Sequence, residues 1–349
     1  MSADIRIDLY SDTHTRPSTA MRDAMARAEV GDEQHESDPT TNRLQDMVAE
    51  LLGKERALFL PSGTMCNVIA YRVWCESGDE VICDATAHTI HSETGGPAAI
   101  AGVMMRSVNG DRGIFTAEQM QAVVRPKKRN APISRLLSLE NTCNFGGGSV
   151  WPIERVADVC GAARDAGLTR HMDGARLLNA VVASSTPAAE YAQHLDSLWI
   201  DLSKGLGCPI GAVLAGDTDF IEQAFRFKHQ YGGALRQSGV ITAAGIYALE
   251  NNVTRLTDDH ANAKRLAGRL AQIPGIEIDT DNIDTNIVFF DVAGTGRTAA
   301  DISQALLADG VHIGAMAMLG PHCMRAVTHL DVTEAMIDEA SDRLGQLLT

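Results

Sequence analysis

Short apolar runs alternate with helical stretches along the first 250 or so residues, and this alternation limits the folds open to the chain. Helical stretches such as Ile153–Ala166 lie between the runs. The runs that we interpret as buried strands are Ala57–Leu60, Glu80–Cys83, Leu136–Leu139, His171–Met172, Ser197–Leu202 and Ala212–Ala215. Strands that alternate with helices form βαβ units, which build a mainly parallel sheet with helices on both faces. We therefore expect an α/β fold.

Helix and domain boundaries can also be placed. Asp38 and Pro39 supply an N-cap and a first-turn proline, and Gly53 ends the helix that follows. Beyond about residue 250, helical stretches and short strands share about 100 residues. These are Leu266–Ile273, Thr285–Asp291, Ala299–Leu307, Met324–Thr328 and Ala335–Leu348. We expect a large domain over residues 1–248, including the N-terminal segment, and a smaller C-terminal α+β domain over residues 249–349.

The composition narrows the classes of partner. Lys and Arg number 30 against 45 Asp and Glu, so the formal net charge is −15. A surface this acidic repels phosphate backbones and anionic lipids, which argues against nucleic acid and membranes as partners. No apolar run is long enough to span a bilayer, and the seven cysteines are scattered without a C-x-x-C pair. We expect reduced thiols and a cytoplasmic location.

Chemically versatile residues follow the predicted strands, at the end where ligands bind to an open α/β sheet. Lys204 would ordinarily be a solvated surface lysine. Here, however, an apolar strand runs directly into its glycine-rich turn, and a desolvated lysine is the residue type that forms Schiff bases. Asp173 also ends a strand. It is either a turn or helix cap, or a carboxylate that keeps a pyridine nitrogen protonated.

Two further features extend this pattern. Ser62-Gly63-Thr64 lies between a strand and a helix, where amides and hydroxyls can bind a phosphate. His88 alone would be interpreted as a structural histidine. Together with Lys204 and Asp173, these residues predict a site for pyridoxal 5'-phosphate (PLP). His88, His91 and Cys143 would suggest zinc, but no local Cys or His completes four ligands, so we expect no metal.

The sequence resembles the low-specificity L-threonine aldolases, PLP enzymes of fold type I in the beta-eliminating lyase superfamily, along nearly the whole chain. The matching segments are Ser11–Thr13, Ala28–Asp32, Asp38–Thr40, Leu58–Asn67, Ala87–His88, Glu140–Thr142, His171–Arg176, Leu202–Gly207, Gly232–Gly239 and Arg325–Val332. The resemblance implies an aspartate-aminotransferase-like fold whose large domain has a mainly parallel seven-stranded sheet. It also implies a homo-oligomer, a dimer or tetramer, whose active sites are shared between subunits.

The resemblance further implies roles for individual residues. Lys204 would carry PLP, His88 would stack on the pyridine ring, and Asp173 would pair with the ring nitrogen. Arg176 would lie near the phenolic oxygen and the substrate. The residues around the phosphate would be Ser62, Gly63, Thr64 and Ser203, with Arg236 reaching it from a neighbouring subunit. The substrate carboxylate would be bound by Ser11, Arg176 and Arg325.

The chain departs from the family pattern at several positions of the site. Cys143 stands where the family has a histidine near the substrate hydroxyl, Phe145 replaces an arginine, and Ser92 replaces an aromatic residue. His35-Glu36-Ser37 stands where the family has Tyr-Gly-Glu. We interpret these changes as an altered, less polar substrate site that includes His35 and Cys143 and favours a different or bulkier β-substituent. The base acting on the substrate hydroxyl would be His88, His91 or His35.

Three functions remain open at this level. The first is an aldolase that cleaves an L-β-hydroxy-α-amino acid, of the threonine or allo-threonine type, to glycine and an aldehyde. The second is another PLP reaction on a β-hydroxy amino acid, either β-elimination or transfer of the glycine unit to another aldehyde. The third is a non-catalytic PLP-binding protein, which the presence of Lys204, Asp173 and the carboxylate-binding arginines argues against.

Overall fold

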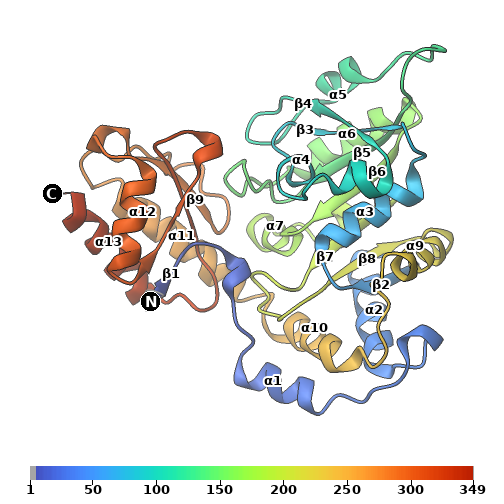
Figure 1. The fold of residues 1–349 in the computed structure, drawn as a ribbon, viewed down its shortest axis with the longest axis horizontal. Coiled ribbons are helices and arrows are strands. Elements are labelled where there is room, and N and C mark those ends of the chain that lie inside the picture. The colour runs from blue at the N-terminus through green and yellow to red at the C-terminus, as the bar shows by residue number, and fades with distance from the viewer. Residues whose placement is uncertain (1–4, 349) are drawn as a thin grey trace. The chain divides into compact units, whose positions relative to one another are not determined.

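The computed structural model describes residues 5–348 and divides into two compact units. The large unit is continuous and spans Pro17–Val253. The second unit joins the N-terminal residues through Arg16 to the chain from Thr254 onward. Figure 1 labels most of the helices and strands of both units.

The large unit is built on a seven-stranded sheet with the order β2-β8-β7-β6-β5-β3-β4. Its strands are β2 (Arg56–Leu60), β3 (Glu80–Asp84), β4 (Met104–Val108), β5 (Ser134–Glu140), β6 (Thr169–Gly174), β7 (Ser197–Asp201) and β8 (Ala212–Gly216). Strand β8 runs antiparallel to both of its neighbours, and the other pairs are parallel. This confirms the mainly parallel, seven-stranded α/β sheet, although the edge strand β4 was not among the predicted runs.

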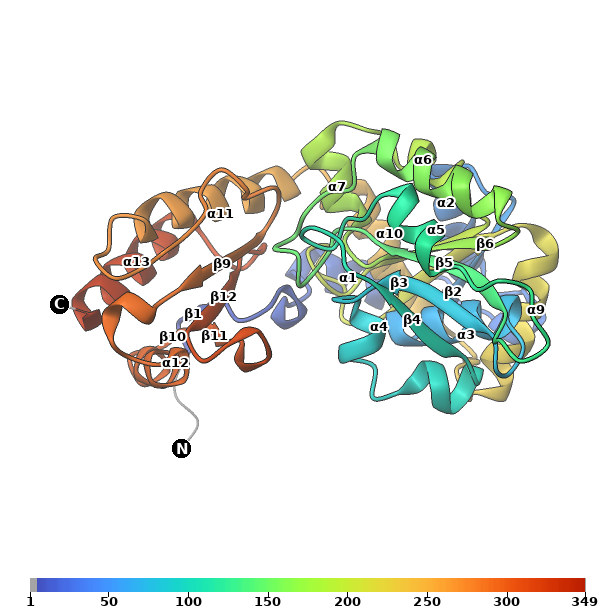
Figure 2. The ribbon, with the colours of Figure 1, turned by 90° about the horizontal axis from the view of Figure 1, so that it is seen from above.

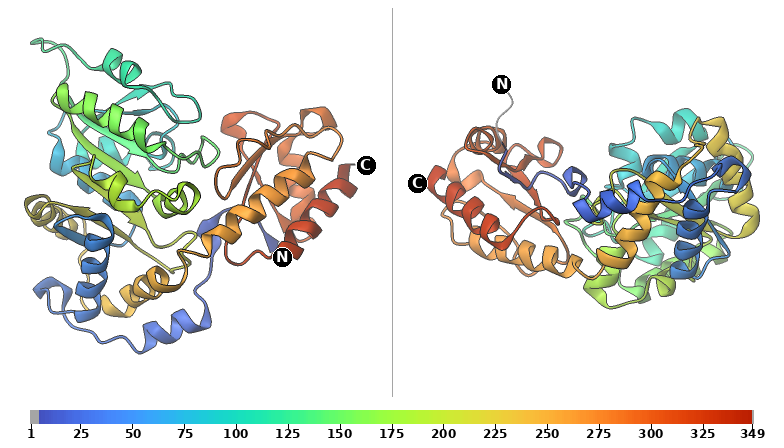
Figure 3. Two further views of the ribbon diagram at one scale, coloured as in Figure 1. Left: turned by 180° about the vertical axis from the view of Figure 1, so that it is seen from behind. Right: turned by 90° about the horizontal axis from the view of Figure 1, so that it is seen from below.

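Helices cover both faces of this sheet (Figure 2, Figure 3). On one face α3 and α9 pack together over a core that includes Leu58, Trp199 and Leu214. On the other face α2 packs on β2 and β8 and contacts α8 and α10. The helices of the large unit are α1 (Thr19–Ala26), α2 (Pro39–Leu52), α3 (Gly63–Trp74), α4 (His88–His91), α5 (Ala117–Val123), α6 (Ile153–Asp165), α7 (Leu177–Ser184), α8 (Ala188–Ala192), α9 (Thr218–Gln230) and α10 (Gly239–Asn251).

Local sequence signals account for the boundaries of α2. The Asp38 side chain accepts a hydrogen bond from the backbone N–H of Thr41, Pro39 opens the first turn, and Gly53 ends the helix at a φ of 60°. A positive φ is the conformation that glycine adopts at least cost. The predicted start and end of this helix are confirmed.

Strand directions gather the carboxyl ends of six strands at one edge of the sheet. Because β2 and β7 both run opposite to β8, β2 is parallel to β7 and to the strands beyond it. The carboxyl ends of β2, β7, β6, β5, β3 and β4 therefore share an edge, and the segments that follow them carry most of the predicted site residues of this unit.

In its described residues, 5–16 and 254–348, the second unit has two small sheets and three long helices. Strand β1 (Ile7–Asp8) pairs in parallel with β10 (Val311–His312), and β12 (Cys323–Val327) lies between β11 (Gly314–Ala315) and β9 (Ile287–Asp291) in an antiparallel sheet. The helices are α11 (Leu256–Leu270), α12 (Ala299–Ala308) and α13 (Glu334–Leu348). This is an α+β arrangement, in which α11 begins ten residues before the predicted Leu266.

The observed division corrects one expectation. The N-terminal segment was expected in the large domain, but it belongs to the second unit, and the boundary lies at 253/254 rather than 248/249. The physical reason is that Ile7 and Leu9 are buried in the core of the second unit, and Leu9 exchanges backbone hydrogen bonds with His312 and Val327. Within residues 5–348, no helix combines the length and apolar character that crossing a membrane requires.

Candidate active site

Asp173 is the next-to-last residue of β6 and is held in a fixed orientation at the carboxyl edge of the large unit's sheet. Its Oδ1 accepts a hydrogen bond from the backbone N–H of Ala175 at 3.1 Å, and its Oδ2 accepts one from Nδ2 of Asn67 at 2.8 Å. The residue is buried, with 3% of its surface exposed. Both oxygens of the Asp173 carboxylate, which the sequence predicted as a site residue, are therefore held by hydrogen bonds.

Asn67, on α3, joins Asp173 to a second buried carboxylate. Its Nδ2 also donates to Oε1 of Glu93 at 2.9 Å, and its Oδ1 accepts from Nε1 of Trp199 at 2.8 Å. Indole nitrogen is a donor only, so the amide oxygen must face Trp199 and the amide nitrogen must face the carboxylates. Asn67 thus uses one amide hydrogen for each acid.

His88 opens α4 and lies among carboxylates. Its Nδ1 is 3.0 Å from Oε1 of Glu93, and its backbone N–H donates to Oε2 of Glu140 at 2.7 Å. Burial alone would lower the pKa of His88, but the hydrogen bond to Glu93 and the charges of Asp173, Glu93 and Glu140 outweigh it and raise that pKa. The surroundings of this histidine favour its charged form.

Glu140, at the end of β5, is the most strongly perturbed of these acids. Desolvation and the charge of Asp173 raise the pKa of Glu140 to about 7, although the backbone N–H groups of Asn144 and His88 oppose the shift. Burial likewise raises the pKa of Glu93. Carboxyl groups with raised pKa values beside a histidine are typical of functional sites rather than of surface ion pairs.

Lys204 follows β7 and forms an ion pair that the sequence did not indicate. Its Nζ lies 2.8 Å from Oδ2 of Asp201 and 5.9 Å from the centroid of the Trp199 ring. Ser203 donates to Oδ1 of the same carboxylate from both its backbone N–H and its hydroxyl. Asp201 therefore orients both residues of the predicted Ser-Lys pair.

The start of α3 carries the predicted phosphate loop. Ser62 is the N-cap, its side chain accepts from the backbone N–H of Met65, and Ser62 and Thr64 are exposed. The first amides of a helix have no partner within it and attract anions. Gly63 is required here because a Cβ atom at this position would lie 2.3 Å from the Trp199 ring. The backbone at the start of α3 therefore packs directly against the ring of Trp199, a residue of β7.

Other predicted residues of the large unit take different positions. Arg176 is buried at the start of α7, and its backbone N–H donates to the carbonyl of Asn141, just after β5. Cys143 is also buried, and its thiol donates to the carbonyl of Glu140 at 3.1 Å. A Cβ atom at Gly113 would lie 2.7 Å from Cβ of Cys143, so a side chain at Gly113 would require this glycine or Cys143 to move.

His35 and Arg236 belong to another neighbourhood, around Asp32. Arg236 forms an ion pair with the Asp32 carboxylate at 2.9 Å, and Nε2 of His35 lies 4.0 Å from that carboxylate. His35 lines a cavity of about 220 Å³ together with Glu36 and Arg56, at the amino end of β2. Within one chain, the structure does not bring these residues to the carboxyl edge that holds Asp173 and Lys204.

Ser11 and Arg325 lie in the second unit. Ser11 caps the short 3-10 helix Asp12–His14 and accepts from the backbone N–H and hydroxyl of Thr13. Arg325 lies on β12, and its Nη2 donates to the carbonyl of Tyr10 at 3.3 Å. Tyr10, which directly precedes Ser11 in the chain, thus accepts a hydrogen bond from Arg325.

Sequence reasoning missed Asn67, Glu93, Asp201 and Glu140 as site residues. The spacing of strand ends could have indicated Asp201 and Glu140, since each ends a strand at the same edge as Asp173. Asn67 carries no comparable signal, because its partners Glu93 and Asp173 lie 26 and 106 residues away along the chain. Glu93 lies five residues after His88, so the acid at this short spacing is the signal that could have indicated it.

Comparison with known proteins agrees with this geometry. The beta-eliminating lyase family matches residues 8–293. A low-specificity L-threonine aldolase of Escherichia coli strain K12 is 41% identical over 336 residues, which cover 96% of this chain and 97% of that one. The structure of a threonine aldolase from Leishmania major has a TM-score of 0.84 at 20% identity and covers 98% of this chain and 100% of that one. A structure of SPT with PLP has a TM-score of 0.74 at 16% identity, over 98% of this chain and 88% of that one. The expected type I fold is confirmed.

Proposed function

We propose that this chain, which belongs to the beta-eliminating lyase family, is a PLP-dependent aldolase that cleaves an L-β-hydroxy-α-amino acid to glycine and an aldehyde. The observation that carries the proposal is the fixed Asp173 carboxylate, which shares one sheet edge with Lys204 and the start of α3. Relatives of nearly the same length are named low-specificity L-threonine aldolases, which supports threonine or allo-threonine as the substrate type.

The residues at this edge fit PLP by their chemistry. The exposed start of α3, with Ser62, Gly63 and Thr64, offers amides and hydroxyls to a phosphate, and Ser203 adds a hydroxyl. Lys204 would hold the aldehyde carbon covalently, and Asp173 would keep the pyridine nitrogen protonated. When bound, PLP supplies an electron sink that stabilises negative charge at the substrate Cα.

The chain's own residues would then position the substrate and move protons. Arg176 supplies a buried guanidinium for the substrate carboxylate, a geometry that recognises carboxylates bidentately. Ser11 and Arg325 are proposed to share this role. Which bond at Cα breaks depends on its angle to the cofactor ring, so the grip on the carboxylate selects Cα–Cβ cleavage.

His88 is the proposed acceptor of the β-hydroxyl proton. With Nδ1–H directed at Glu93, the neutral ring keeps its lone pair on Nε2. The Glu93 carboxylate also stabilises the imidazolium that forms when Nε2 takes a proton, as an acid does behind a catalytic histidine. The raised pKa of His88 is consistent with this stabilisation. The buried thiol of Cys143 is held by a backbone carbonyl and is a poor alternative base.

The proposal also covers assembly and location. We propose a homo-oligomer in which the exposed Arg236 reaches the phosphate of a neighbouring subunit, and in which His35 approaches a substrate in the same way. The cysteines of the chain are free thiols, six of them buried, which supports a cytoplasmic location.

Product analysis of the purified, PLP-loaded protein tests this function. We expect glycine and the matching aldehyde from threonine, allo-threonine or phenylserine, and no turnover by Lys204→Ala. Reduction with borohydride followed by peptide mass spectrometry should place the PLP label on Lys204. Formation of an oxoacid and ammonia instead would assign β-elimination, and inertness toward every β-hydroxy amino acid would assign a binding protein. A label on another lysine would contradict the site itself.

A further inference from the structure

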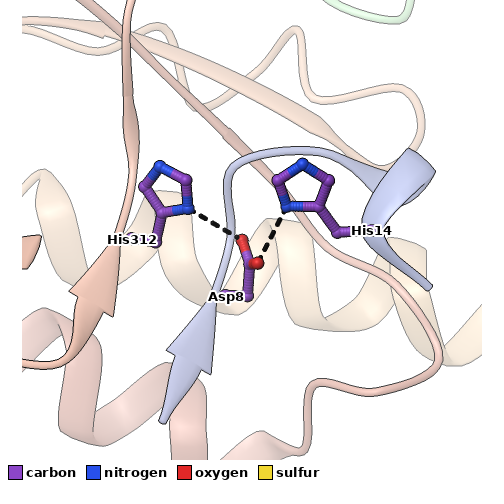
Figure 4. A group of neighbouring side chains, drawn as sticks. All are labelled: Asp8, His14 and His312. Atoms are coloured by element: carbon purple, nitrogen blue, oxygen red, sulfur yellow. Dashed lines mark hydrogen bonds and ion pairs between the residues drawn. The ribbon is translucent and has the colours of Figure 1, made fainter. Parts of the chain in front are cut away.

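Three potential metal ligands converge in the second unit, on residues that the proposed aldolase site does not use. They are Asp8, His14 and His312, drawn in Figure 4. Nδ1 of His14 lies 2.8 Å from Oδ2 of Asp8, and Nδ1 of His312 lies 3.4 Å from Oδ1 of the same carboxylate. The three ligand atoms all lie within 4.8 Å of one another. Ligands of a tetrahedral zinc ion, about 2.0–2.1 Å from the metal, are about 3.3 Å apart.

The backbone brings these side chains together before any ion binds. Asp8 and His312 are paired residues of β1 and β10, and the carbonyl of Asp8 accepts a hydrogen bond from Nε2 of His329. His14 ends the short 3-10 helix that Ser11 caps. A site built on paired strands and a capped turn holds its ligands with little loss of chain entropy on binding.

Ring stacking fixes the two imidazoles further. The Tyr10 ring is stacked on His312 at 4.4 Å and 12°, and on His14 at 5.2 Å and 17°, measured between ring centroids and planes. The two imidazoles are themselves 5.9 Å apart at 29°. Stacking restrains the rotation of each ring about its side-chain bonds, so both Nδ1 atoms stay directed at the Asp8 carboxylate (Figure 4).

His312 has the properties of a ligand rather than of a surface histidine. Its Nδ1 atom is shielded from solvent and makes no hydrogen bond of good geometry. An imidazole binds metals through the lone pair of a ring nitrogen. A buried nitrogen with an unused lone pair beside a carboxylate is costly unless something fills the place between them.

We propose that Asp8, His14 and His312 bind one divalent transition-metal cation, Zn²⁺ or a cation of similar preference. Two imidazoles favour such cations over Mg²⁺ and Ca²⁺, which prefer sites made of oxygen ligands. The two Nδ1 atoms and one carboxylate oxygen fill three positions, and water takes the remainder. The site uses none of the proposed PLP residues and would add a metal to a chain whose sequence indicated none.

The position of the site gives the bound ion a structural role. The segment between Asp8 and His14 contains Tyr10 and Ser11. The carbonyl of Tyr10 accepts a hydrogen bond from Arg325, and Ser11 caps the 3-10 helix that ends at His14. An ion bound to both ends of this segment and to His312 would tie it to β10. It would thereby restrain two residues proposed to bind the substrate carboxylate.

To test the proposal, the full-length, PLP-loaded protein is first dialysed against a chelator and is then titrated with Zn²⁺. We expect one equivalent of Zn²⁺ by calorimetry, and visible d–d bands when Co²⁺ is used as the probe. His14→Ala and His312→Ala should each lower the affinity at least about tenfold, since even residues that only support a ligand typically change metal affinity 10–100-fold. His14 is exposed, so His14→Gln serves as a second variant if His312→Ala does not fold.

The matched controls are His322→Ala and Cys323→Ser, which change the adjacent His-Cys pair in the same unit. Both are partly buried and could bind zinc adventitiously. They should leave the affinity unchanged. The proposal is overturned if wild-type protein takes up no Zn²⁺ at tens of micromolar. It is equally overturned if uptake survives in His14→Gln and is lost in a control. Neither result depends on aldolase activity, so failure here leaves the proposed function untouched.

Discussion

At the scale of the residue, the buried polar groups around Asp173 hold one another in place, so a single substitution affects several contacts. Asn67 is the clearest case, because it serves Asp173, Glu93 and Trp199 at once. None of these contacts touches a reacting atom. Asn67 is therefore a positioning residue, and its value lies in keeping two carboxylates at fixed places beside His88.

We expect Asn67→Ala to lower kcat/KM for threonine cleavage by about 10- to 100-fold. We also expect the substitution to lower the free energy of unfolding by about 2–3 kcal/mol, because it leaves buried polar groups without a partner. Steady-state kinetics and urea unfolding measure the two effects. Asn42→Ala is the control, since the Asn42 amide makes an exposed bond to a backbone carbonyl. Equal activity of the Asn67 variant and the wild type would remove Asn67 from the positioning role.

His171 gives a pH dependence whose sign follows from burial. Desolvation lowers the pKa of His171 to about 3, against about 6.5 in the unfolded chain. Between these values the unfolded chain binds a proton that the folded chain does not, so stability is lost as the pH falls below 6.5. We expect the unfolding free energy of His171→Gln to fall less steeply there, by up to about 1.4 kcal/mol per pH unit. Urea unfolding at pH 5 to 7 measures the slopes, and parallel curves would contradict this account.

At the scale of the element, Asp38 is more than the cap of α2. Besides Thr41, its carboxylate accepts from the backbone N–H groups of Gly31 and Gly239, which lie before α2 and at the start of α10. Its side chain is fully buried. One carboxylate thus joins the starts of two helices that pack against each other and a loop between α1 and α2.

We expect Asp38→Ala to lower the free energy of unfolding by about 3 kcal/mol or more, because three backbone amides lose their acceptor. An ordinary exposed N-cap is worth about 1 kcal/mol. Ser18→Ala, at the exposed cap of α1, is the matched comparison. If guanidinium unfolding gives the same loss for both variants, the contacts to Gly31 and Gly239 contribute nothing.

Elements whose signals are local could be predicted from the sequence, and elements defined by distant partners could not. Asp38, Pro39 and Gly53 bound α2 correctly because capping depends on neighbouring residues. Strand β4 was missed because it is an edge strand with partly exposed residues, including Arg106 and Ser107, so it lacks a continuous apolar run. β1 is too short for any periodicity, so the place of the N-terminal segment could not be read from its own residues.

The same distinction applies to the site. Lys204, Asp173 and the Ser62-Gly63-Thr64 loop follow strands and were placed at one edge by the topology alone. The ion pair between Glu33 and Lys228 was invisible, because a buried lysine 195 residues from its partner looks like any polar residue of an amphipathic helix. His35 was expected beside the substrate, but within one chain it lies near Asp32.

At the scale of the whole molecule, Arg236 tests whether the site is shared between subunits. Within the chain, Arg236 makes an exposed ion pair with Asp32, and such pairs contribute little to stability. We expect sedimentation to give a dimer or tetramer, and Arg236→Ala to weaken PLP binding at least about tenfold. Asp32→Asn breaks the same ion pair and keeps the cap, so it should leave PLP affinity close to wild type. A fully active monomer, or equal losses in both variants, would contradict a shared site.

The second unit is built from two separate stretches of the chain, so the large unit can fold before the second unit is complete during synthesis. The large unit is continuous, so its chain is complete once residue 253 has left the ribosome. Strand β1 must wait for β10, 304 residues later by the Asp8–His312 and Ile7–Val311 pairings. At a translation rate of about 5–20 residues per second, the wait lasts roughly 15 to 60 s. Ile7 and Leu9 stay without their core throughout that time, so the nascent protein carries an apolar N-terminal segment that a chaperone can bind until the last hundred residues emerge.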